Sequence, residues 1–120
     1  MPHLMIEFTA NVLLDQPRLL AECNAALLAT GQFGEPDIKS RCIVLDSYRQ
    51  GTVARRDGFV HATLSILSGR APELRKSIAE AVRDAIVARV ASMNRQLPLQ
   101  VTVDVREMQR DTFAKSVLPG

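Results

Sequence analysis

The second residue of the chain could act as an unusual base. Pro2 stands directly behind the first methionine, at the head of MPHLMIEFT. If Met1 is removed, Pro2 carries a secondary amine, and burial or nearby cations would bring the pKa of that amine toward neutrality. If Met1 is retained, the Pro2 nitrogen is an amide without a basic lone pair. A structural explanation also exists, because proline is tolerated at the first residue of a strand.

Two arginines stand where they could bind carboxylates. Arg41 lies in a stretch that turns apolar directly after it, and Arg70 directly precedes a predicted helix, where unpaired backbone donors favour an anion. A guanidinium grips a carboxylate through two parallel hydrogen bonds, so the pair would suit a dianionic substrate. Taken singly, either arginine is better explained as a surface side chain. The case for a site depends on their combination with Pro2.

Hydrophobic periodicity predicts a β-α-β-β-α-β order, which is an α+β fold. Asp15 is a suitable N-cap for a first helix that Gly31 would end, and Pro72 suits the first turn of a second helix that would end near Asn94. The polar stretch 49–58 predicts a hairpin turn between two strands. Four strands are expected in all, over residues 3–9, 38–48, 59–67 and 99–105.

The order divides into two similar halves, each a β-α-β unit with a right-handed crossover. Leu19, Cys23 and Leu27 form the apolar stripe of the first helix, and residues repeating every four positions from Ile78 to Val90 form that of the second. Both helices are expected on one face of a four-stranded sheet. The other face would then have no cover, which invites oligomerisation.

Composition limits the class of protein. A chain of 120 residues predicts one domain over 1–120, and the net charge of +2 with 4% aromatic residues argues against a nucleic-acid partner. Cys23 and Cys42 lack metal-ligand spacing and are expected to be core residues in a reducing compartment. No apolar run is long enough to span a membrane, so a cytoplasmic protein is expected. Phosphate-loop, dinucleotide and zinc motifs are absent, which favours chemistry without a cofactor or metal.

The order of several segments resembles the tautomerase superfamily, and within it the 5-carboxymethyl-2-hydroxymuconate isomerase family of homoprotocatechuate degradation, a route of aromatic compound catabolism. The likeness covers nearly the whole chain. Its segments are PHLMIE, ALLATGQF, SRCIVLDSY, DGFVHATLSILSGR and DTFAKS.

The resemblance implies a homotrimer with inward-facing sheets and an amino-terminal proline as acid and base, a role that falls on Pro2. By position, Arg70 and Arg41 would bind the substrate, and Lys39 replaces the first arginine of the family's Arg-Ser-Arg stretch. A lysine keeps the charge but cannot form the same fork, so the resemblance implies a different contact with the substrate at this position. Two further departures are Ala71 in place of a capping serine and Tyr48 in place of a larger aromatic residue. Phe33 and Tyr48 are candidates for lining a neighbour's pocket.

On this hypothesis neutral Pro2 moves a proton within an unsaturated dicarboxylate while Arg41 and Arg70 stabilise the dienolate charge. Two alternatives stay open. One is a different proline-dependent reaction, either another tautomerisation or the hydration of an unsaturated acid. The other is a non-catalytic trimeric module that binds a ligand without turning it over.

Overall fold

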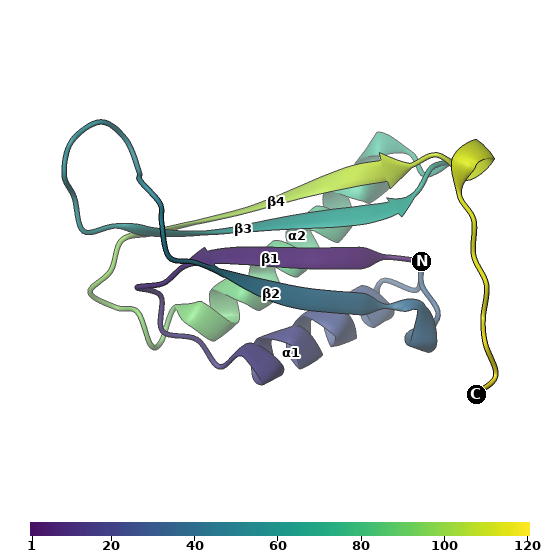
Figure 1. The fold of residues 1–120 in the computed structure, drawn as a ribbon, viewed down its shortest axis with the longest axis horizontal. Coiled ribbons are helices and arrows are strands. Elements are labelled where there is room, and N and C mark those ends of the chain that lie inside the picture. The colour runs from purple at the N-terminus through teal and green to yellow at the C-terminus, as the bar shows by residue number, and fades with distance from the viewer.

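In the computed structural model, which describes residues 1–120, two helices cover one face of a four-stranded sheet (Figure 1). The predicted β-α-β-β-α-β order is therefore confirmed. The strands are β1 (His3–Thr9), β2 (Lys39–Leu45), β3 (Gly58–Leu67) and β4 (Leu99–Met108). The helices are α1 (Gln16–Ala29) and α2 (Pro72–Val90), with short 3-10 turns η1 (Glu35–Asp37) and η2 (Arg110–Thr112).

The strands lie in the order β2-β1-β3-β4. β1 pairs with β2 in parallel, β3 pairs with β4 in parallel, and β1 meets β3 antiparallel, so the two expected β-α-β units are present. The predicted hairpin between the second and third strands is wrong, because β1 lies between them. In β1 and β3, the two central strands, every second residue is buried along almost the whole strand. Because these two strands pair with each other, β2 lies at an edge of the sheet. Residues 46–57 therefore cross over the end of the sheet (Figure 1).

The core lies between the sheet and the two helices. From α1 it takes Leu19, Cys23 and Leu27, as predicted, while the strands contribute alternate residues such as Ile6 and Leu64. From α2 it takes Ile78, Val82, Ile86 and Val90, all of them predicted. Neither helix has the length and apolar character needed to cross a membrane.

Side-chain hydrogen bonds define where the helices begin and end. Asp15 accepts a hydrogen bond from the Arg18 backbone N–H at 3.2 Å, which confirms it as the N-cap of α1. α2 ends at Val90, four residues before the predicted end at Asn94. The side-chain amide of Asn94 turns back and donates to the Val90 carbonyl at 2.7 Å, so it takes a carbonyl at the end of the helix.

No helix covers the second face of the sheet (Figure 1). The strand registers place mostly polar residues on this face. His61 shares a hydrogen bond of 2.7 Å with Thr102 across β3 and β4, and Glu7 lies opposite His61 across β1 and β3. Met5 and Ile43, the apolar residues expected here, sit among these polar neighbours. The uncovered face is therefore suited to a mixed polar interface rather than a purely hydrophobic one.

Candidate active site

Pro2 lies at the start of β1, where the sheet holds it in place. Its side chain is fully buried. Its carbonyl oxygen accepts a hydrogen bond of 3.1 Å from the backbone N–H of Lys39, the first residue of β2. The chain therefore fixes the position from which an amine at Pro2 would act.

A pocket of about 390 Å³ opens beside this end of β1. It is lined by Met1, by Pro36, Asp37 and Lys39, and by the tail segment 115–118. The tail passes the same end of the sheet as the amino terminus and η1 (Figure 1). Because Met1 itself lines the pocket, removal of Met1 would extend the space toward the Pro2 nitrogen.

The surroundings of the amino terminus favour a neutral amine. In the chain with Met1 present, the pKa of the Met1 ammonium is lowered from its ordinary value of 8.0, chiefly because burial disfavours the charge. The carboxylate of Asp37 opposes this shift, whereas Lys115, Arg70 and Lys39 add to it. Removal of Met1 would bring the Pro2 amine next to the same charged groups.

Arg70 is held in one orientation by the loop that follows α1. Its Nε donates to Gln32 Oε1 at 3.2 Å and its Nη2 donates to the Gln32 carbonyl at 3.1 Å. Its Nη1 donates to the Leu67 carbonyl at 3.3 Å, and its guanidinium carbon lies 4.9 Å from the centre of the Phe33 ring. Sequence reasoning missed Gln32, since nothing in the loop GQFGEPD distinguishes it from an ordinary polar residue.

Arg41 and Tyr48 lie in different places relative to this group. Arg41 contacts His3, with 3.3 Å between Arg41 Nη1 and His3 Nδ1, so it reaches the same end of the sheet by way of the residue after Pro2. Tyr48 packs edge-to-face on Phe59, with 6.3 Å between ring centres, at the opposite end of the sheet. The seven residues of β1 separate the two ends by about 20 Å.

The structure thus gathers Pro2, Lys39, Arg70 and Phe33 at one end of a single chain. Arg41 stands at the edge of this group, and Tyr48 lies outside it. Lys39 is restrained as well, because its Nζ donates to the Asp37 carbonyl at 2.9 Å. This arrangement can hold an anionic ligand next to the amino terminus.

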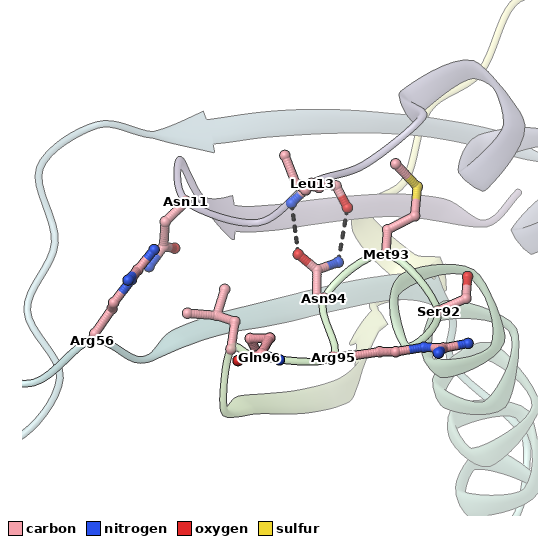
Figure 2. Close-up of a pocket in the computed structure, with 9 residues that line it drawn as sticks. Asn11, Leu13, Arg56, Ser92, Met93, Asn94, Arg95 and Gln96 are labelled. Carbon is pink, nitrogen blue, oxygen red and sulfur yellow. Dashed lines mark hydrogen bonds between the residues drawn. The ribbon is translucent and has the colours of Figure 1, made fainter.

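A larger pocket of about 470 Å³ lies at the other end of the molecule (Figure 2). Asn94 forms its floor, accepting a hydrogen bond from Leu13 N–H at 2.8 Å and donating to the Leu13 carbonyl at 2.9 Å. Arg56 and Arg95 stand on opposite sides, and their side chains do not converge (Figure 2). The carboxyl end of α2 also points here, and its partial negative charge disfavours anions. This pocket is accordingly not the candidate site.

The two β-α-β units in one four-stranded sheet define a small α+β protein with the tautomerase fold. Its fold is shared with a fused 4-OT described as a symmetric trimer, with a TM-score of 0.72 at 16% identity, over 95% of this chain and 91% of the other. A crystal structure of a 5-carboxymethyl-2-hydroxymuconate isomerase from Deinococcus radiodurans R1 is more similar. It has a TM-score of 0.86 at 29% identity, over 96% of this chain and 88% of the other.

Sequence comparison gives the family within this class. The family described as 5-carboxymethyl-2-hydroxymuconate isomerase matches residues 2–117. The 5-carboxymethyl-2-hydroxymuconate Delta-isomerase of Escherichia coli is 30% identical over 110 residues, which cover 90% of this chain and 87% of the relative. The chain belongs to the 5-carboxymethyl-2-hydroxymuconate isomerase family and is an isomerase, which confirms the resemblance found in its sequence.

Proposed function

We propose that this isomerase moves a proton within an unsaturated dicarboxylate of the 5-carboxymethyl-2-hydroxymuconate type, with the amine of Pro2 as acid and base. The names of the relatives support the substrate class. The observation that carries the proposal is the charged pocket at the start of β1, where Lys39 and Lys115 line the space that Met1 occupies. Burial and the cations lower the pKa of the Met1 amine there, and the Pro2 amine would meet the same cations once Met1 is removed. The proposal requires that Met1 is removed.

The reaction is a transfer of one proton from one atom of the substrate to another. The Pro2 nitrogen takes a proton from the dienol hydroxyl or from an allylic carbon, and the electron pair left behind spreads over the conjugated system. The protonated Pro2 then returns the proton to a different carbon, so that substrate and product are isomers. Negative charge develops between the two steps, and cations fixed beforehand stabilise it best.

The side chains around Pro2 have different roles in this reaction. Arg70 keeps two N–H groups beyond the three that the protein engages, and these would bind a substrate carboxylate. Lys39 supplies a point charge, and Arg41 adds a second guanidinium at the rim of the site. The buried ring of Phe33 forms an apolar wall behind Arg70.

The proposal includes a homotrimer in which the uncovered sheet faces turn inward. A symmetric trimer is the assembly described for the fused 4-OT, which has this fold. An assembly would also give Tyr48 a role, because only in a neighbouring subunit could it reach a Pro2 site. The mass of the native protein in solution, measured by light scattering, should be three times the chain mass, and a monomer would contradict this part.

The test of the function is a proton-transfer assay on protein whose intact mass shows that Met1 is absent. With 5-carboxymethyl-2-hydroxymuconate as substrate, Pro2→Ala should lower kcat by about 100-fold or more, because general acid–base groups contribute on that scale. Equal turnover by Pro2→Ala would remove proline catalysis. Binding of the substrate without turnover by the processed protein would instead support a ligand-binding module.

Lys39 gives a reason to test a second reaction. A lysine cannot form the fork of an arginine, so Lys39 would hold a carboxylate differently from an arginine at the same position. The alternative is tautomerisation or hydration of a smaller unsaturated acid by the same Pro2 amine. Simple 2-hydroxydienoates assayed in parallel distinguish the two, since a higher kcat/KM on them than on the dicarboxylate would favour the alternative.

A further inference from the structure

Asp37 contacts two lysines at the pocket of about 390 Å³ beside Pro2 (the Pro2 pocket). Its main-chain carbonyl accepts a hydrogen bond of 2.9 Å from Lys39 Nζ, and its carboxylate Oδ1 accepts one of 3.2 Å from Lys115 Nζ. The chain has only three lysines, and the third, Lys76, lies on α2. Two of the three therefore meet at one residue of one pocket.

The carboxyl-terminal tail delivers Lys115 to this place. η2 is tied to the end of β3, where Arg110 Nε donates to the Ser68 carbonyl at 2.6 Å. From there the chain runs without helix or strand past the amino terminus toward η1 (Figure 1, yellow). Residues 115–118 form one wall of the 390 Å³ pocket, and the ion pair between Lys115 and Asp37 joins that wall to η1.

We propose that Lys115 is a substrate-binding residue, and that Lys39 and Lys115, positioned by Asp37, bind the substrate carboxylate that Arg70 does not hold. This inference rests on the proposed function of the Pro2 pocket. Each ammonium has three N–H donors and gives one to Asp37, so two remain on each lysine for a ligand. Asp37 is a positioning residue in this arrangement, since it acts through the lysines.

The charges in the pocket match a dianion. The terminal amine is faced by Asp37 from η1, Lys39 from β2, Arg70 from the segment before α2 and Lys115 from the tail. His3 lies beside it on β1. Three cations and one carboxylate leave two positive charges in excess, which a dicarboxylate neutralises while the amine itself stays neutral.

The pair persists at neutral pH because Asp37 remains ionised. The hydrogen bond from Lys115 holds the pKa of the Asp37 carboxyl below its usual range. Lys115 thereby offsets the one negative charge that raises the pKa of the terminal amine. It serves the site in two ways, as a ligand for the substrate and as a partner for Asp37.

The first test compares a dicarboxylate with a matched monocarboxylate. Calorimetric binding of trans,trans-muconate to the processed protein should weaken about tenfold in Lys115→Met, the loss expected for one hydrogen bond between charged groups. Sorbate, which has the same chain and one carboxylate, should bind Lys115→Met and the unmodified protein alike. Lys115→Arg should restore muconate binding, and Lys76→Met should leave it unchanged. Equal muconate binding by Lys115→Met and the unmodified protein would overturn the proposal.

The second test is a pair of pH profiles with opposite expected shifts. Removing the cation in Lys115→Met should move the acid limb of kcat/KM to higher pH, whereas removing the carboxylate in Asp37→Asn should move it to lower pH. If the tail only stabilises the fold, the acid limb of kcat/KM would move in the same direction in both variants, or it would not move in either. Such a result would overturn the role of Lys115 in the site.

Failure of the proposed function gives a different pattern. If Pro2→Ala keeps full turnover, proline catalysis is excluded. The loss of muconate binding in Lys115→Met still measures the contribution of the lysine pair to dicarboxylate binding. If Pro2→Ala is inactive and Lys115→Met is unaltered in binding and pH profile, the function stands and this inference falls. Circular dichroism of each variant checks that the fold is intact.

Discussion

The guanidinium carbon of Arg70 lies 4.9 Å from the centre of the Phe33 ring, with the backbone and side chain of Gln32 bonded to the same guanidinium. The loop after α1 thus orients a residue that precedes α2. The sequence of neither segment indicates this contact, because 38 positions separate Gln32 from Arg70. The site depends on the two β-α-β units meeting through β1 and β3.

This relationship predicts that Arg70→Lys is not a conservative change. A lysine cannot keep the three hydrogen bonds and the ring contact at once, so its charge would no longer be fixed in place. We expect kcat/KM to fall about 30-fold, equivalent to about 2 kcal/mol of lost transition-state stabilisation. Arg83→Lys, on the exposed side of α2, is the matched control and should be neutral. An Arg70→Lys enzyme with unaltered kcat/KM would show that the fixed orientation is unnecessary.

Local patterns in the sequence predicted the elements well, since each pattern reports on burial of a single strand or helix. β1 was expected over residues 3–9 and lies at His3–Thr9, and the buried stripe from Ile78 to Val90 was expected residue by residue. The hairpin was wrong for a physical reason. Chain order alone cannot tell whether residues 46–57 form a tight turn or pass over the end of β1.

The site was only partly accessible from the sequence. Pro2, Arg70, Lys39 and Phe33 were candidates from the sequence, and the structure places all four at one end of the sheet. Asp37 and Lys115 have no distinguishing local pattern, because the first is a loop carboxylate and the second lies in an irregular tail 78 positions away. Contacts at that separation follow from the folded topology alone.

Asn94 should contribute strongly to stability. It forms three hydrogen bonds, two with the backbone of Leu13 and one with the Val90 carbonyl, and it is buried. Asn94→Ala leaves these backbone groups without their partner, which should lower the free energy of unfolding by about 2–3 kcal/mol. Urea denaturation at equal protein concentration measures this.

Asn24 on α1 offers a matched control for that experiment. Its side-chain oxygen is buried without a hydrogen-bond partner. Asn24→Ala should therefore change the free energy of unfolding by less than about 0.5 kcal/mol, helped by the better helix propensity of alanine. An equal decrease in the free energy of unfolding in the two variants would mean that the hydrogen bonds of Asn94 do not add to stability.

The two cysteines should resist thiol reagents in the native protein. Burial, followed by the nearby Cys42 and Glu22, raises the pKa of the Cys23 thiol to about 12, and burial raises the pKa of Cys42 as well. In Cys42→Ala the remaining thiol should react with Ellman's reagent at pH 8 only as fast as the fold opens. Rapid labelling without urea would contradict the burial of Cys23.

His3 should make the fold sensitive to acid. Burial, then the charges of Arg41 and Lys39, lower the pKa of His3 from its ordinary value of 6.5. The unfolded chain takes up a proton near pH 6.5 that the folded chain resists, so this part of the stability is present above pH 6.5 and is lost as pH falls through the folded pKa. Removing the neighbouring charge in Arg41→Met should raise the folded pKa and reduce the loss. Proton NMR of the His3 ring, with urea denaturation at several pH values, measures both quantities. A His3 that titrates at its ordinary pKa in the folded protein, unmoved by Arg41→Met, would show that the contact between the two side chains has no electrostatic consequence.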